Sequence, residues 1–168
     1  MALFIALIIV VADQALKAWI LSVVNLPQIG TRPLFGPFAL TMVWNQGVSF
    51  GFLRADHDIV RWLLAGFSIG VAVLLAVWVR KADRPLFATA VGLVMGGAIG
   101  NVIDRIRFGA VADFIDVRPL TAGLFPWIFN LADSAISIGI CLLLLDMLRQ
   151  DGRERAAKSA EGAHGDAA

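Results

Sequence analysis

The sequence is poor in charge and in the residue types that build metal sites and disulfides. Charged residues make up 16% of the chain, against about 25% in an average soluble domain. The single cysteine excludes an internal disulfide and a cysteine-based zinc site. The two histidines, His57 and His164, lie far apart, so the histidine motif of zinc proteases is absent. We expect no metal and no other cofactor.

The charge balance is also close to neutral, which removes one class of partner. The formal net charge is +1, so there is no electrostatic reason to expect binding to nucleic acid. What is abundant is apolar residues: 59% of the chain is hydrophobic and the mean hydropathy is +0.80. This composition indicates an integral membrane protein with membrane lipid around it. The length of 168 residues suits one domain of a few spanning helices, and we expect a monomer.

The apolar runs predict an all-α membrane protein with four transmembrane helices and a small extracytoplasmic β-rich segment. The expected spans are residues 2–24, 60–79, 85–104 and 131–148. A cleaved signal peptide is the alternative for the first run, but that run lacks a basic start and is interrupted by Asp13 and Lys17. These two residues are four apart and share a helix face. In lipid such groups normally face a bundle interior or water.

The connections at 25–58 and 106–130 read differently, because proline and glycine recur in them. Phe38–Val43, Ser49–Phe52 and Val111–Val117 are candidate short strands, and we expect a small sheet at the membrane surface. Residues 1–149 then form a single membrane-embedded domain. Residues 150–168 are rich in charged residues, alanine and glycine and are expected to be a disordered tail.

The orientation depends on the arginines and lysines. Four spans place both termini on one side, and seven basic residues fall on each side of the expected membrane, so the count is tied. The density of basic residues decides the orientation, because Arg80, Lys81 and Arg84 lie within one very short loop. We therefore expect both termini in the cytoplasm and the 25–58 and 106–130 segments outside it.

Glycines and polar residues mark the third span and its surroundings. Gly92, Gly96 and Gly100 are spaced by four, which predicts a glycine ridge against which a neighbouring helix can pack closely. Asn101, Asp104 and Arg105 follow on one face of the same helix. An ion pair of Asp104 with Arg105 or Arg107 is the simplest explanation of that aspartate.

Three further aspartates follow in the chain. Asp133 lies at the start of the fourth span, where it could cap the helix. Asp116 has Arg118 as a nearby partner, and we place it outside any site. Asp113 lacks such a neighbour and precedes Phe114, an apolar setting that raises a carboxyl pKa. Two adjacent carboxylates can share a proton and activate water, as in aspartyl proteases. Spacing allows Asp113 and Asp133 to meet but does not require it.

Five motifs occur in an order that resembles the type II signal peptidases, the bacterial lipoprotein signal peptidases. The resemblance covers residues 5–148. The motifs are Asp13-Gln14-Ala15-Leu16-Lys17, Asn45-Gln46-Gly47-Val48-Ser49-Phe50, the run from Gly96 to Arg105, Gly109-Ala110-Val111-Ala112-Asp113-Phe114 and Phe129-Asn130-Leu131-Ala132-Asp133. Ala112 stands where the family usually has valine, a small apolar change.

The resemblance implies an aspartyl endopeptidase of the bacterial inner membrane. Such an enzyme removes the signal peptide from diacylglyceryl-modified prolipoproteins, cutting before the lipidated cysteine, near the extracytoplasmic face. By the family pattern Asp113 and Asp133 are the catalytic pair. The remaining motif positions are expected to order the site or to contact the substrate: Asp13, Lys17, Asn45, Gly47, Asn101, Asp104, Arg105, Asn130 and Ala132.

Two other functions remain open from the residues themselves. Ser49 and Lys17 could form a serine–lysine peptidase pair, since a desolvated lysine can act as a base. The intramembrane acids could instead serve a small proton- or ion-coupled carrier. Carriers tend to show internal repeats with broken helices, and no repeat is visible in this sequence.

Overall fold

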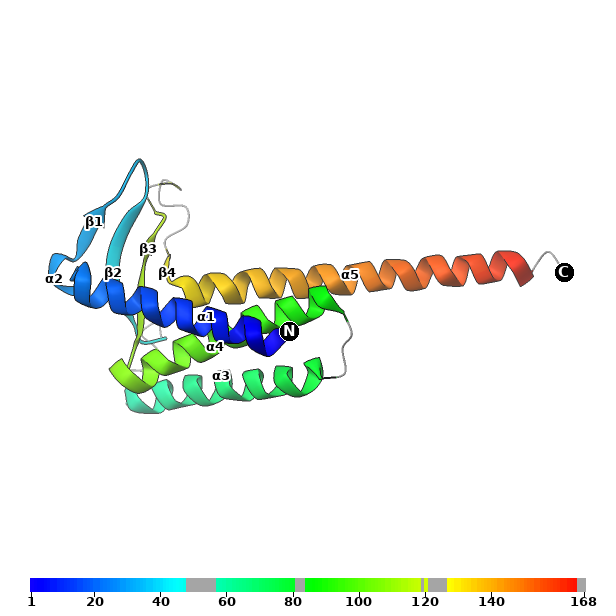
Figure 1. The fold of residues 1–168 in the computed structure, drawn as a ribbon, viewed down its shortest axis with the longest axis horizontal. Helices are drawn as coiled ribbons and strands as arrows, with labels where there is room; N and C mark the ends of the chain where they lie inside the picture. Colours follow the sequence, from blue (N-terminus) through cyan, green and yellow to red (C-terminus); the bar gives the residue numbers. More distant parts are fainter. Residues whose placement is uncertain (48–56, 81–83, 119, 121–126, 166–168) are drawn as a thin grey trace.

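Four long helices lie side by side, and a small sheet closes one end of the bundle (Figure 1). The computed structural model describes residues 1–47, 57–80, 84–118, 120 and 127–165. The helices are α1 Ala2–Ala18, which continues as a π-helix over Trp19–Val23, then the short α2 Leu26–Ile29, α3 His57–Val79, α4 Pro85–Phe108 and α5 Leu131–Gly165. The strands are β1 Thr31–Pro33, β2 Ala39–Asn45, β3 Val111–Asp116 and β4 Ile128–Phe129.

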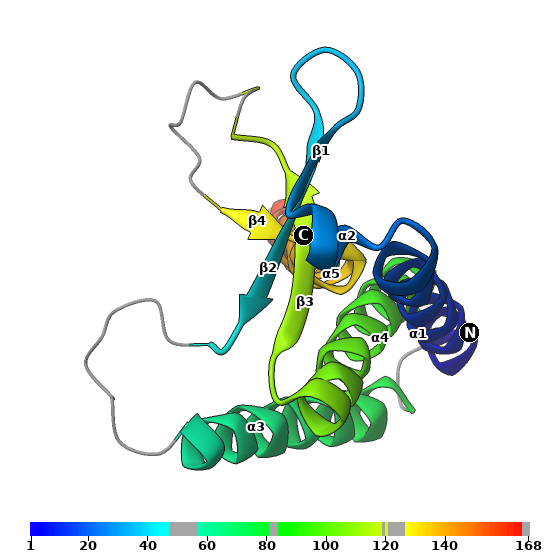
Figure 2. The ribbon, with the colours of Figure 1, turned by 90° about the vertical axis from the view of Figure 1, so that its left-hand side faces the viewer.

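Helix α4 is the centre of the bundle, with α1, α3 and α5 packed around it (Figure 2). In its most apolar window 72% of the residues are buried, against about a fifth in each of the other three spans. The glycine ridge makes this packing possible. A Cβ on Gly92 would lie 2.7 Å from Ala2 O, and one on Gly96 would lie 2.8 Å from Ala6 O. The expected close helix approach is therefore confirmed, and the neighbour is α1.

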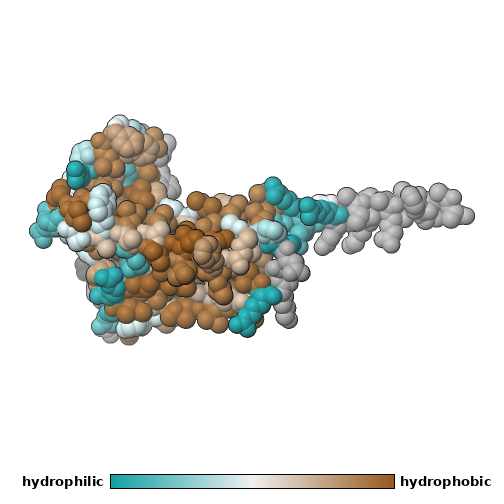
Figure 3. All heavy atoms as spheres, viewed as in Figure 1, coloured by the Kyte–Doolittle hydropathy of each residue, from teal (hydrophilic) through white to brown (hydrophobic). Residues whose placement is uncertain are grey.

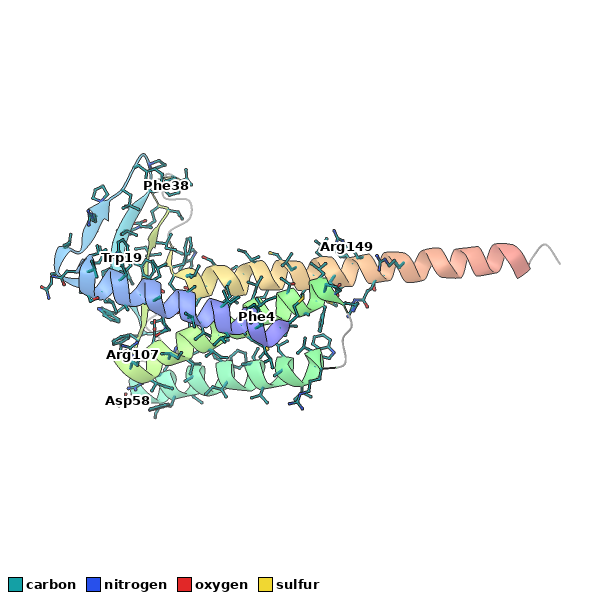
Figure 4. All side chains as sticks on the ribbon, viewed as in Figure 1. Phe4, Trp19, Phe38, Asp58, Arg107 and Arg149 are labelled. Atoms are coloured by element: carbon teal, nitrogen blue, oxygen red, sulfur yellow. The ribbon has the colours of Figure 1, made fainter. Side chains whose placement is uncertain are left out.

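The described residues contain four helices that are long and apolar enough to cross a membrane, as the sequence predicts. Figure 3 shows apolar side chains gathered along the helices, with polar ones towards the ends. Figure 4 places Phe4 within this apolar stretch, Asp58 and Arg107 at the sheet end, and Arg149 at the other end. Charged groups thus border the apolar stretch on both sides, as the membrane interfaces require.

The last helix differs from the expectation. The chain is helical to Gly165, whereas its polar composition predicts a disordered tail from residue 150. The physical reason lies in the composition: arginine, glutamate, lysine and alanine recur after Arg149, and all four favour helices. A helix already formed by the preceding span can extend into such a sequence without a new nucleation step.

The sheet is antiparallel with the order β1-β2-β3-β4, so it joins the two segments that connect the spans. The predicted strands near 38–43 and 111–117 are confirmed as β2 and β3, while Ser49–Phe52 lies outside the described residues. In the β2–β3 ladder Val43 pairs with Asp113 and Asn45 with Val111, after an irregularity beyond Leu40. Side chains two apart share a face, so Asn45 lies diagonally opposite Asp113.

Candidate active site

The start of α5 forms its own capping structure. The Asn130 side-chain Oδ1 accepts from the Asp133 amide at 2.9 Å, and Asp133 Oδ2 accepts from the Asn130 amide at 3.2 Å. This reciprocal arrangement satisfies backbone donors that a helix start leaves free. The capping role considered for Asp133 is therefore present. It uses one carboxylate oxygen and leaves Oδ1 for another partner.

Asp113 and Asp133 belong to one hydrogen-bond network. Asn130 Nδ2 donates to Asp113 Oδ1 at 2.6 Å, and Asn45 Nδ2 donates to Asp113 Oδ2 at 2.9 Å. Asn101 Nδ2 donates to Asp133 Oδ1 at 2.8 Å, and Asn101 Oδ1 accepts from Asn130 Nδ2 at 3.3 Å. Three asparagines from β2, α4 and the start of α5 thus bind both carboxylates. Residues from four distant stretches of the chain meet at this point.

The two carboxylates differ in their surroundings. The Asp113 side chain lies on β3 and is 1% exposed, whereas Asp133 is partly exposed. Burial raises the pKa of Asp113 to about 6, and the nearby charge of Asp133 adds to the shift, while hydrogen bonds from Asn45 and Asn130 oppose it. Such a pair can hold one proton between two acids under mildly acidic conditions.

Asp133 faces a hollow of about 310 Å³. Its other lining residues are Trp127, which precedes β4, Phe129 of β4, and Ser134, Ser137 and Ile138 in the first turns of α5. The hollow is largely apolar and lies at the start of α5, so it could hold an apolar ligand beside the Asp133 carboxylate.

A buried ionic cluster lies directly behind the two aspartates. Lys17 Nζ is 2.9 Å from Asp13 Oδ2 and 2.8 Å from Asp104 Oδ2, and it donates to Asn101 Oδ1 at 3.4 Å. The three ionic side chains are at most 2% exposed. The predicted shared face of Asp13 and Lys17 is confirmed. The expected pairing of Asp104 with Arg105 or Arg107 is wrong, because Lys17 reaches it from α1.

The carboxylates of this cluster also hold the backbone next to each candidate catalytic residue. Asp13 Oδ1 accepts from the Ala132 amide at 3.0 Å, immediately before Asp133. Asp104 Oδ2 accepts from the Ala112 amide at 3.1 Å, immediately before Asp113. Lys17 binds both acids and therefore links the two backbone positions. The cluster can fix the separation of the two aspartates without touching a substrate.

The remaining predicted site residues lie around this centre. Arg105 Nη1 donates to Asn101 O at 3.4 Å, and Gly47 donates its amide to Asn45 Oδ1 at 2.8 Å. Gly47 has φ +85°, and a Cβ there would meet Leu64. The left-handed backbone and the contact together explain a glycine next to Asn45.

Asp116 lies outside the network, as predicted. Arg118 donates to both of its oxygens, at 2.9 and 2.7 Å, and Thr41 Oγ1 donates to Oδ2 at 2.7 Å. The hydrogen bonds from Arg118 hold the pKa of Asp116 well below its usual value. This aspartate stays ionised in a local pair with Arg118 at the C-terminal end of β3.

Gln14 is a contributor that the sequence reasoning missed. Its Nε2 donates to Asp104 Oδ1 at 3.0 Å, to Asp13 Oδ2 at 3.1 Å and to Gly100 O at 3.2 Å, while its Oε1 accepts from Arg107 at 3.2 Å. It lies inside the first sequence motif, between Asp13 and Lys17, and that position was the available signal.

Lys17 is bound as a structural cation rather than placed as the base of a serine–lysine pair. Its ammonium is occupied by two carboxylates and the Asn101 side chain, which is the environment of a structural cation. Ser49, the other half of that alternative, lies outside the described residues.

Comparison with known proteins agrees with the geometry. The sequence pattern of the family described as Signal peptidase (SPase) II matches residues 5–149. The chain is 57% identical over 143 residues to a lipoprotein signal peptidase of Caulobacter vibrioides, covering 84% of this chain and 83% of that protein. It is 42% identical over 165 residues to one from Methylobacterium radiotolerans, covering 96% and 92%.

The fold has solved counterparts as well. A bacterial membrane enzyme determined by the in meso method at 2.3 Å resolution superposes with a TM-score of 0.74 at 27% identity, covering 90% of each chain. A second such structure, at 1.9 Å resolution, gives 0.73 at 28% identity, covering 88% of this chain and 92% of that one. The chain therefore belongs to the signal peptidase II family and is an aspartic endopeptidase of the bacterial membrane.

Proposed function

We propose that the chain removes the signal peptide from diacylglyceryl-modified prolipoproteins, cutting before the lipidated cysteine, with Asp113 and Asp133 activating water. The observation that carries this assignment is the shared network: the side chains of Asn130 and Asn101 bind each other, and each side-chain amide donates to one of the two carboxylates. The relatives named lipoprotein signal peptidase support the substrate class. The apolar hollow beside Asp133 suits a substrate that arrives from the lipid.

In the mechanism we propose, the buried Asp113 carries the shared proton and the more accessible Asp133 is ionised. Asp133 takes a proton from water, and Asp113 donates a hydrogen bond to the scissile carbonyl. Water attacks the carbonyl carbon and a tetrahedral intermediate forms. As the C–N bond breaks, the leaving amine accepts a proton from the pair. The two carboxyls share one proton and behave as a coupled pair, so this assignment of the proton describes the resting state of the pair.

The other predicted site residues take supporting roles in this proposal. Asn45, Asn101 and Asn130 orient the carboxylates, while Asp13, Lys17 and Asp104 fix the backbone through Ala112 and Ala132. Gly47 and Arg105 lie at the edge of the network, where a peptide backbone could pass.

The test compares three matched aspartate-to-asparagine variants. Asp113→Asn and Asp133→Asn should abolish cleavage of a diacylglyceryl-modified prolipoprotein by purified enzyme, seen as loss of the shortened product. Asp116→Asn is the control, because Asp116 lies on the same strand but pairs with Arg118 outside the network. It should retain cleavage. Full activity of either dyad variant would overturn the assignment.

Two further arms test the chemistry and the substrate. Ser49→Ala should cleave normally, and its inactivity would favour the serine–lysine alternative instead. The same prolipoprotein without its diacylglyceryl group should be cut at least tenfold more slowly, because the lipid contributes binding energy that a bare peptide lacks. Equal cleavage of both substrates would contradict the proposed lipid requirement.

A further inference from the structure

A second polar cluster lies at the end of the bundle opposite the sheet. Arg84, just before α4, pairs with Asp146 of α5 at 2.7 Å, and Gln150 Nε2 donates to the same carboxylate oxygen at 3.1 Å. Asp146 is only 6% exposed. The Arg84 guanidinium also lies 5.0 Å from the centre of the Phe87 ring. The acid in this cluster is therefore already neutralised by its partners.

A hollow of about 190 Å³ beside this pair is rich in arginine. Arg84, Arg149 and Arg153 line it, together with Pro85, Leu86, Asp146 and Gln150. Arg149 and Arg153 are four residues apart on α5 and are exposed, and no ion pair within the described part of the chain holds either. Three arginines thus face a hollow whose one aspartate is paired, so the site is electropositive.

An apolar hollow of about 300 Å³ adjoins the basic one and shares Arg84, Asp146 and Gln150 with it. Its apolar lining comes from Trp78, Phe87, Leu143 and Met147, on the last turns of α3, the start of α4 and the spanning part of α5. Asp151 of α5 also lines this hollow, so the two hollows together hold three arginines and two aspartates, of which Asp146 is paired with Arg84. Arg149 lies where α5 leaves the bundle (Figure 4). The apolar hollow therefore faces the hydrocarbon side and the basic one faces the interface.

We propose that the two hollows form one binding site for an anionic phospholipid. The phosphodiester lies among Arg84, Arg149 and Arg153, and one acyl chain lies against Trp78, Leu143 and Met147. Arginine binds phosphate oxygens through paired N–H donors, which suits this headgroup. A zwitterionic lipid would bring its ammonium close to the same arginines and bind less well. The site is separate from the aspartate network and goes beyond the peptidase activity.

The test uses the full-length protein in bilayers of phosphatidylcholine and phosphatidylglycerol, with bromines on the acyl chains of one lipid at a time. Brominated chains quench the fluorescence of a tryptophan that they contact. Subtracting the quenching measured for Trp78→Phe from that of the wild type gives the contribution of Trp78. We expect phosphatidylglycerol to be favoured at Trp78 by about tenfold. Free phosphate cannot produce this signal, because it carries no bromine.

Variants that each remove one arginine charge distinguish a specific lipid site from the effect of general surface charge. Arg149→Gln and Arg153→Gln should each lower the preference about fivefold. Arg80→Gln, at the same membrane boundary but outside both hollows, should leave it unchanged. Equal quenching by the two lipids would overturn the proposal. The proposal would also be overturned if Arg80→Gln lowered the lipid preference as much as Arg149→Gln does, because the general positive charge of this membrane face would then explain the preference.

Discussion

At the scale of single residues, the protonation of Asp113 should control the pH range of cleavage. Its pKa is raised to about 6 by burial and by Asp133. Below that value the pair keeps its proton, and above it the doubly ionised form, which cannot polarise the carbonyl, accumulates. We therefore expect the basic limb of kcat/KM to begin near pH 6 in the free enzyme.

Asn45 offers a direct test of this cause. Its amide donates to Asp113 Oδ2 at 2.9 Å, and this bond lowers the pKa of Asp113. Asn45→Ala removes that effect, so the pKa should rise and the basic limb of kcat/KM should move to higher pH, whatever happens to the maximal rate. Thr41→Ala is the control on the same strand, because Thr41 binds Asp116 instead. If the basic limb of kcat/KM moved to lower pH in Asn45→Ala, the result would contradict the placement of the shared proton on Asp113.

At the scale of helices, Lys17 joins α1 to the other helices of the site. It lies between the carboxylates of Asp13 and Asp104, all of them buried. Lys17→Met leaves two buried carboxylates facing each other without a cation, which should lower the free energy of unfolding by about 3–5 kcal/mol. Chemical unfolding in detergent measures this change. Asp58→Asn breaks only the ion pair of Arg61 with an aspartate that is 84% exposed, and should cost at most about 1 kcal/mol.

Gly100 tests whether the fit between helices positions the active site. A Cβ there would lie 2.7 Å from Asp13 Oδ2 and 3.4 Å from the Ala132 Cβ. Gly100→Ala should therefore displace the Asp13 carboxylate, which holds the backbone next to Asp133, cut the cleavage rate at least tenfold and destabilise the protein by about 1–3 kcal/mol.

The matched control for Gly100 is Gly66→Ala on α3. A Cβ at Gly66 would have no atom within 4 Å, so this variant should keep both activity and stability. A Gly100→Ala enzyme as active as Gly66→Ala would show that the contact with Asp13 does not set the geometry of the site.

Helices and single strands could be predicted from sequence because their signals are local. Long apolar runs give the four spans, and a β-rich stretch gives β3 almost as expected. The pairing of β2 with β3 could not be predicted, because it depends on which connecting segments meet above the bundle. The polarity of the chain beyond residue 150 predicts disorder, whereas its helix-forming residues extend α5 to Gly165.

In the site, too, some features can be predicted from the sequence and others depend on how the helices pack. The ordered motifs predict Asp113 and Asp133 as the pair, which spacing alone does not, and both carboxylates lie in one hydrogen-bond network. The partner of Asp104 was wrong because the nearest arginines in sequence are not the nearest cation in space. Lys17, on another helix, takes that place. Long-range ion pairs across a bundle follow from helix packing, which one sequence does not specify.

At the scale of the whole molecule, the proposed orientation requires the sheet and the dyad to lie outside the cytoplasm. Arg32 on β1 and Arg80 after α3 are exposed at opposite ends of the bundle, so a matched pair of arginine-to-cysteine variants can test this. The native Cys141 is replaced by serine first, since it is exposed on α5.

A membrane-impermeant thiol reagent applied to intact spheroplasts should label Arg32→Cys directly and Arg80→Cys only after permeabilisation. The physical reason is that loops rich in arginine and lysine, such as the one that contains Arg80 and Arg84, tend to be retained on the cytoplasmic side. The reverse labelling pattern would contradict the orientation. It would also move the hollow beside Asp133 to the cytoplasmic leaflet, so that an exported prolipoprotein could no longer reach it. The labelling result thus tests the proposed substrate route as well as the topology.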